Sequence, residues 1–225
     1  MRIESMLSMD IPRGWSWPEA PKERGSLRVG HIMPSGFERY LRIFHPFQNK
    51  AAPSSGNNST SDHLSWKKMA ERLGVPFHPS LLHQLLLPFQ ERERSAFELQ
   101  YGNLEPKAMN ALVGVLESSS DTVPVFFYYG LSAQIRNPDH QPLMWRGQLA
   151  DIWEVQQEAN MIMGEHIPHS PEWIWPEDRR WLVLTDYDLP STYVAAGSGV
   201  ADAILQQAEL EVHEVNPDTP LNEYK

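Results

Sequence analysis

Hydrophobic and polar residues alternate along several stretches of the chain, and a period of two is the pattern of β-strands. In residues 40–45 apolar side chains occur in both alternating sets, which predicts a strand in the interior of a sheet. Residues 122–130 are a continuous apolar and aromatic run, typical of a strand covered on both faces. Together the pattern predicts strands over residues 27–31, 40–45, 122–130, 181–186, 192–196 and 210–215.

Other stretches place apolar residues at the three- and four-residue spacing of amphipathic helices. Gly74 ends the segment 63–74 as a helix C-terminal glycine, and Pro106 lies in the first turn of the segment 103–119. The pattern predicts helices over residues 63–74, 78–89, 103–119, 148–165 and 199–207, and a loop over residues 131–147.

Strands and helices follow one another without a regular βαβ repeat, which predicts the α+β fold class, with a mixed or antiparallel sheet and several helices packed on it. The sequence shows no internal repeat and no domain boundary, so residues 1–225 are expected to form a single domain. The Gly-, Ser- and Asn-rich stretch at about 48–62 predicts a mobile loop, and about 216–225 a loose tail.

Composition narrows the class of protein. A hydrophobic share of 41% and a charged share of 21% are those of an ordinary globular protein. The formal net charge of −10 argues against nucleic-acid binding and suits a basic protein partner. Many proteins are acidic simply because charge keeps them in solution, and the sequence favours this explanation over a basic partner. The chain has no cysteine, no signal-peptide pattern and no apolar run near the roughly 20 residues of a membrane span. We therefore expect a soluble cytoplasmic protein without membrane association.

Asp186 and Asp188 form a D-x-D pair, whose carboxylates project from the same face of a strand and could hold a divalent cation. Such a pair would suit a metal-dependent enzyme that acts on a phosphate- or sugar-containing substrate. A structural role explains the same residues, with Asp188 stabilising the turn and Asp186 paired with Arg180. The sequence favours the structural role, because a lone D-x-D occurs often by chance.

Other short motifs are also explained by structure. The glycines before Ser198 could form an anion site at a helix N-terminus, but capping by Ser198 accounts for them equally well. His166 and His169 lie between prolines, and His78 and His83 are five residues apart, so neither pair has the spacing of a metal site. The sequence predicts no metal and no cofactor.

Arg42 and His45 occur in a strongly apolar strand, so both need polar partners if they are buried. Arg42 could hold a carboxylate or phosphate of a ligand in bidentate fashion, or pair with Asp186, Asp188 or Glu38 inside the protein. The hydroxyls of residues 191–193 would need a base such as His31 or His45 to act as nucleophiles.

Two segments, "SGFERYLRIFHPF" and "WPEDRRWLVLTDYDLPSTYV", together with "WKKMAERLG", resemble a group of uncharacterised bacterial proteins. The resemblance implies a bacterial origin and no activity. This chain has Ala195-Ala196 where the group often has glycines, which weakens an anion-binding loop there. The shared motifs give one candidate pocket, made of Arg42, His45, Asp178, Arg179, Trp181, Asp186, Asp188, Ser191, Thr192 and Tyr193.

These observations lead to a binding protein as the main hypothesis, with a protein partner or a small anionic ligand. A specific form is an acidic inhibitor or immunity-type protein, which predicts an exposed patch of Asp and Glu with aromatic anchors. The enzyme hypothesis predicts a concave pocket where Arg42 and the two aspartates meet. A structural subunit would instead expose a large apolar patch. The sequence does not determine the oligomeric state.

Overall fold

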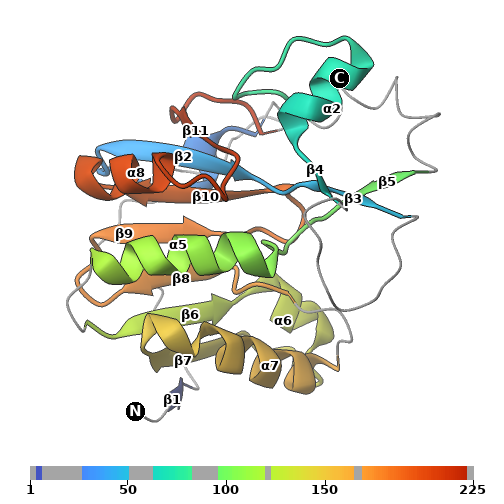
Figure 1. Cartoon of the computed structure of the whole chain (residues 1–225). Coiled ribbons are helices and arrows are strands. Elements are labelled where there is room, and N and C mark those ends of the chain that lie inside the picture. Colours follow the sequence, from blue (N-terminus) through green and yellow to red (C-terminus); the bar gives the residue numbers. More distant parts are fainter. Residues whose placement is uncertain are drawn as a thin grey trace.

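The computed structural model describes residues 4–6, 27–50, 63–82, 96–119, 123–164 and 169–221. Its centre is an eight-stranded sheet in which every neighbouring pair is antiparallel (Figure 1). The strands are, in spatial order, β1 (Glu4–Met6), β7 (Leu143–Gly147), β6 (Val125–Tyr129), β8 (Trp173–Pro176), β9 (Trp181–Leu184), β10 (Ser191–Ala196), β2 (Arg39–Phe44) and β11 (Val212–Val215).

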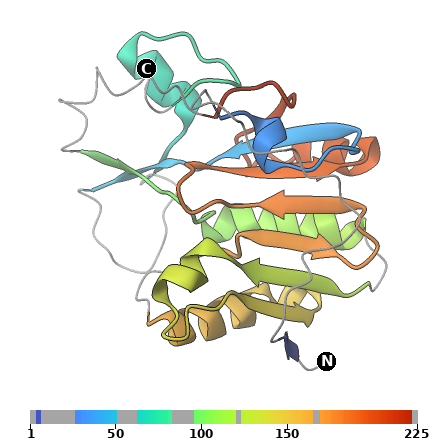
Figure 2. The same cartoon turned by 180° about the vertical axis from the view of Figure 1, so that it is seen from behind.

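Three helices cover one face of this sheet. Figure 1 shows them in front of the strands, and Figure 2 shows them behind when the view is reversed. They are α5 (Pro106–Ser118), α7 (Ile152–Met163), which follows the short 3-10 helix η2 (Leu149–Asp151), and α8 (Ser198–Leu205). The short helices α1 (Val29–Ile32) and α6 (Leu131–Arg136) lie outside this layer (Figure 2).

Alternation along the strands gives the sheet two different buried faces. Leu41, Ile43, Val183 and Val194 belong to the larger apolar cluster, which contains the inner sides of α5, α7 and α8. Their neighbours in sequence, including Tyr193, pack in a second cluster on the opposite face. Because both faces are covered, β6, β8 and β9 in the middle of the sheet consist of apolar and aromatic residues, as the sequence pattern of residues 122–130 predicted for β6.

A smaller, three-stranded sheet extends from the end of β2. Its order is β4 (His63–Leu64), β3 (Phe47–Asn49) and β5 (Phe97–Leu99). It packs with α2 (Trp66–Leu73) around the fully buried Trp66. Ser65 caps α2 by accepting a hydrogen bond from the Lys68 N–H, and Gly74 ends the helix in the left-handed conformation. This unit and the main sheet meet at Phe44, where β2 ends.

The α+β class and the antiparallel sheet agree with the sequence prediction. Five of the six predicted strands are present, and helices occur in four of the five predicted segments. In the fifth, residues 78–82 are loop and turn, and residues 83–89 lie outside the described residues. Ser198 is the first residue of α8 rather than its cap, and the Glu38 carboxylate binds the Ser198 N–H and hydroxyl.

Other predictions are corrected by the structure. The strand expected over residues 27–31 is mostly the helix α1, because the N–H groups of Val29 and Gly30 bind the carbonyls of Thr219 and Pro217. Residues 131–147, expected to be loop, contain α6 and β7.

Two boundaries also change. The loop expected at about 48–62 begins later, since residues 48–49 belong to β3, and residues 51–62 lie outside the described part. The tail expected at about 216–225 is anchored as far as Leu221, which is buried and donates its N–H to the Leu27 carbonyl.

Candidate functional site

Arg42 is a buried cation held by uncharged groups. Its side chain, on the face of the sheet opposite the three helices, is only 2% exposed. Nε donates to Ser191 Oγ at 2.9 Å, and Nη1 donates to the carbonyls of Pro79 and Leu81 at 3.1 and 2.9 Å. The guanidinium also lies over the Phe44 ring, with 4.1 Å from Cζ to the ring centroid. Burial lowers the pKa of Arg42, and Tyr193 partly offsets that effect.

His45 and Thr192 lie on the other face of the same two strands, where they form a second polar group. His45 Nδ1 is 3.1 Å from the Gln100 carbonyl, which can only accept, so Nδ1 carries the proton. Nε2 is then an acceptor, and it receives the Thr192 hydroxyl at 2.9 Å. Thr185 Oγ1 is 2.9 Å from Thr192 Oγ1 and donates to it. Burial lowers the pKa of His45 to about 4, so the ring is neutral at pH 7.

Asp186 lies at the same end of the sheet, in the turn between β9 and β10. One of its carboxylate oxygens accepts the N–H of Asp188 at 2.8 Å, so the side chain that stabilises the turn is that of Asp186 and not, as predicted, that of Asp188. Burial raises the pKa of Asp186, and the negative charges of Glu172 and Asp188 add to this effect. Burial raises the pKa of Tyr193. The nearby charge of Arg42 lowers this pKa and that of Asp186 raises it, so both residues lie close to the tyrosine. Arg180, the partner that the sequence suggested for Asp186, pairs with Asp178 instead.

Asp178, Arg179 and Trp181 lie at the opposite end of β9, beyond the reach of the first group. Four residues of extended chain separate Trp181 from Thr185, which corresponds to about 13 Å. Arg179 has a positive φ of 59° in the turn between β8 and β9, and Trp181 is fully buried in the core beneath the helices. These residues form a tight turn and its anchor.

The candidate pocket is therefore divided into three separate groups rather than one site. Arg42 and Asp186 both lie near Tyr193. Five residues of the candidate pocket are buried, namely Arg42, His45, Ser191, Thr192 and Tyr193. Within the described ranges, no group of three His, Asp or Glu side chains could hold a metal ion. The hydrogen bonds of Arg42 and His45 join the two sheets, because their partners come from β10, the segment after α2 and the segment after β5.

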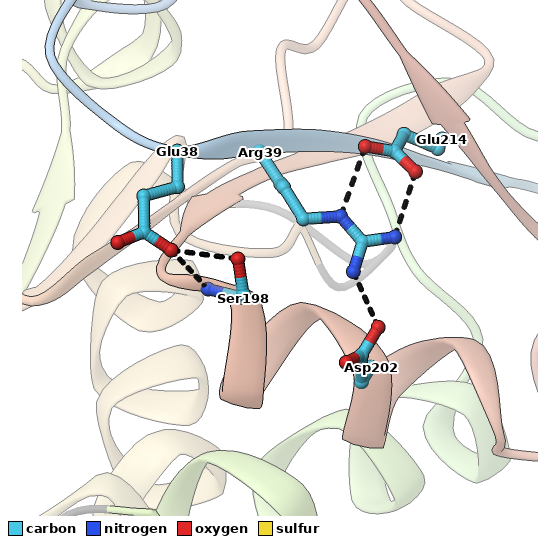
Figure 3. A network of polar contacts seen from close by, with 5 residues as sticks. All are labelled: Glu38, Arg39, Ser198, Asp202 and Glu214. Atoms are coloured by element: carbon cyan, nitrogen blue, oxygen red, sulfur yellow. Dashed lines mark hydrogen bonds and ion pairs between the residues drawn. The ribbon is translucent and has the colours of Figure 1, made fainter.

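A polar network at the edge of the sheet has a similar structural role (Figure 3). Arg39 binds both carboxylate oxygens of Glu214, at 2.9 and 2.7 Å, and also binds Asp202 of α8. Beside it, Glu38 binds the first residue of α8. Arg39 thus joins β2, β11 and α8, and the pKa of Glu214 is lowered by this cation.

Sequence analysis missed the outer surface of the three helices, here called the helical face: residues 106–118, 149–163 and 198–210. Lys107 is its basic residue, and none of these residues is arginine. Its carboxylates are exposed or half-buried: Glu117, Asp151, Glu154, Glu158, Asp202 and Glu209. The signal was present in the sequence, because the predicted helices of residues 148–165 and 199–207 contain acidic residues and no Lys or Arg.

The helical face also carries an aromatic side chain. Trp153 of α7 is 37% exposed, and its indole N–H donates to Asn110 Oδ1 of α5 at 3.1 Å. The hydrogen bond fixes the edge of the ring against α5.

A groove between α5 and α8 completes this face. It has a volume of about 680 Å³, within the range of ligand sites in proteins. Small apolar residues lie between polar ones along it. The groove is lined by Lys107, Asn110, Ala111, Gly114, Val115, Ser118, Ser119, Ala203, Gln207 and Glu209.

Comparison with protein-family models, with curated proteins and with solved structures finds no match to this chain. In the part of the chain that the structure describes, no helix is long and apolar enough to cross a membrane.

Proposed function

We propose that this chain is a binding protein whose partner is a protein with a basic surface, and that the partner docks on the helical face. The observation that carries this proposal is the charge imbalance of the residues that make up the helical face, which include six carboxylates and one basic residue, Lys107. The cations beside this face are Arg39, which is paired with Asp202, and Arg180, which donates to the Ser119 carbonyl. Electrostatic complementarity of this kind speeds association and excludes acidic competitors.

The contacts of these carboxylates support the proposal. Asp202 is already bound to Arg39, and Asp151 accepts the Gln148 N–H, so both contribute to the fold. Glu117, Glu154 and Glu209 have no such internal role among the described contacts, and all three are exposed. Carboxylates that stabilise nothing inside the protein are free to pair with lysine and arginine side chains of a partner.

Trp153 supplies the apolar part of the proposed interface. Large, partly desolvated aromatic side chains carry much of the binding energy at protein interfaces, and charged residues at the rim add mainly to the association rate. An acidic face around an oriented tryptophan suits a protein that covers a basic target, as an inhibitor or immunity-type protein does. The proposal thus keeps the binding hypothesis and names the helical face as the surface that binds the partner.

The test compares two variants with equal net charge. The face variant E117Q/E154Q/E209Q removes three of the six carboxylates of the helical face, and the control variant E71Q/E98Q/D139N removes three exposed acids elsewhere. Each protein is immobilised and used to capture proteins from an extract of the source cells, with identification by mass spectrometry. We expect a basic protein to be retained by the wild type and the control and lost from the face variant.

The captured protein is then purified and its Kd is measured with all three baits. The proposal predicts a Kd raised roughly tenfold or more for the face variant and nearly unchanged for the control. It also predicts weaker binding as salt shortens the Debye length from about 10 Å to about 3 Å. Equal losses in both variants would show a general charge effect and contradict the proposed surface.

A further inference from the structure

We infer that the groove between α5 and α8 receives an α-helix of the basic partner. This inference rests on the proposed function and adds the conformation of the bound segment. It follows from three properties of the groove: its length along α5, its small side chains, and the hydrogen bonds that its walls already make.

The groove follows one side of α5 from end to end. Its lining residues on this helix recur at intervals of three or four, from Lys107 through Gly114 to Ser119. Such residues lie on one side of a helix, and the twelve steps from residue 107 to residue 119, at 1.5 Å each, give a length of about 18 Å. The other wall is formed by Ala203, Gln207 and Glu209. A helix of three turns has a comparable length.

Gly114 opens the middle of the groove. A glycine inside a helix lowers stability relative to alanine, so it usually has a packing or functional reason. A Cβ at Gly114 would meet nothing within 4 Å, so packing inside this chain does not require the glycine. With Ala111 and Ala203 nearby, the small side chain lets another backbone approach α5 closely.

The walls favour a helical segment over an extended one. An extended segment needs partners for its own N–H and C=O groups, whereas a helix satisfies most of them internally. Part of the polar lining is already used: Ser118 and Ser119 donate to the carbonyls of Gly114 and Leu116, Asn110 Oδ1 accepts from Trp153, and Gln207 Nε2 donates to the Ala203 carbonyl. A helix with a small apolar side facing Gly114 could direct its lysines and arginines toward Glu209 and Glu117.

The experiment uses three synthetic peptides of about 15 residues, a length that suits three to four helical turns. The first is helix-forming and carries lysines around a small apolar side. The second has a central proline, which breaks the helix. The third replaces each lysine by glutamate. Affinity is measured by fluorescence anisotropy against the wild type, Gly114→Phe and a matched control, Gln134→Phe, on the exposed side of α6.

We expect only the first peptide to bind the wild type well. Gly114→Phe should raise its Kd by about tenfold or more, and Gln134→Phe should leave it within about twofold. Thermal melting checks that both variants fold. If Gly114→Phe does not fold, Ala203→Leu fills the groove from the opposite wall.

Three outcomes would overturn the inference. One is failure of the helical peptide to bind the wild type, and another is equal binding of the proline peptide. The third is unchanged affinity in a folded, groove-filled variant. If that unchanged affinity is accompanied by lost binding in E117Q/E154Q/E209Q, the acidic face survives as the docking surface and only the groove is wrong.

Discussion

Thr192 donates its hydroxyl hydrogen to Nε2 of His45, across the junction of β10 and the end of β2. The direction is fixed at the far side of the ring, where Nδ1 must donate to the Gln100 carbonyl. The hydrogen bonds therefore run in one sense, from Thr185 through Thr192 and His45 to Gln100. These hydrogen bonds join β10 to the residues that directly follow β9, β2 and β5, and none of the groups is charged.

Thr192→Val keeps the size and β-branching of the side chain and removes its hydroxyl. The buried Nε2 of His45 would then lack a donor, and the Thr185 hydroxyl would lose its acceptor. We expect a loss of about 1–3 kcal/mol in the free energy of unfolding, measured by urea denaturation. Thr185→Val, which leaves the Thr192 to His45 bond intact, should cost less. Equal costs would contradict the stated direction.

His45 should make the protein less stable as the solution becomes acidic. Its pKa is about 4 in the fold and 6.5 when unperturbed, so between these values the unfolded state binds a proton that the folded state does not. Stability is complete above pH 6.5 and falls toward pH 4, by about 3 kcal/mol for the full difference.

The measurement is the free energy of unfolding between pH 7 and pH 4 for the wild type and His45→Asn. Asparagine keeps a donor near Nδ1 and does not titrate, so the variant should have a flatter profile. Asp186 and Glu211, whose pKa values burial raises, titrate in both proteins and cancel in the comparison. Identical slopes would show that His45 does not cause the acid effect.

Arg42→Lys tests whether the geometry of the guanidinium matters or only its charge. A lysine ammonium cannot reach Ser191 and the carbonyls of Pro79 and Leu81 together, and it cannot lie flat on Phe44. We expect a loss of about 2–3 kcal/mol in unfolding free energy. Arg28→Lys, at an exposed ion pair with Asp218, is the control and should change stability by less than about 0.5 kcal/mol.

Arg179→Gly should stabilise the protein. Arg179 has a φ of 59°, a conformation that costs roughly 1 kcal/mol for a residue with a Cβ and little for glycine. We expect a gain of about 1 kcal/mol, observed as a higher melting temperature. Arg180→Gly is the contrast, because it removes the bonds of Arg180 to Asp178 and to the Ser119 carbonyl. A lower melting temperature for Arg179→Gly would mean that its side chain contributes more than the turn conformation costs.

The strands were predictable where local pattern and burial agree. Residues 125–129 and 181–184 are continuous apolar runs because helices and loops cover both faces of the sheet. Prediction failed where distant residues decide the structure. α1 forms where a strand was expected because its N–H groups bind residues 217–219, and β7 forms after Asn137-Pro138 because β6 pairs with it.

The candidate site was predictable only in part. That Arg42 needed buried partners followed from its apolar neighbours, but the partners depend on β10 lying beside β2, about 150 residues later in the sequence. Residues 42 and 45 point to opposite faces of the sheet, and so do residues 192 and 193. For this reason residues that are close in the sequence belong to two separate polar groups, one around Arg42 and one around His45. The acidic helical face could have been predicted from the sequence by counting the charged residues in each predicted helix.

The position of β2 in the sheet has a consequence for synthesis on the ribosome. Both of its neighbours, β10 and β11, lie in the last quarter of the chain, and Phe44 pairs with Ser191. At about 5–20 residues per second, β2 is synthesised roughly 7–30 seconds before its first partner strand. Until then Arg42 lacks the Ser191 hydroxyl and His45 lacks Thr192, so the growing chain cannot complete its junction. Interrupted translation would leave an apolar strand open on both edges, a state that quality-control proteases and chaperones can recognise.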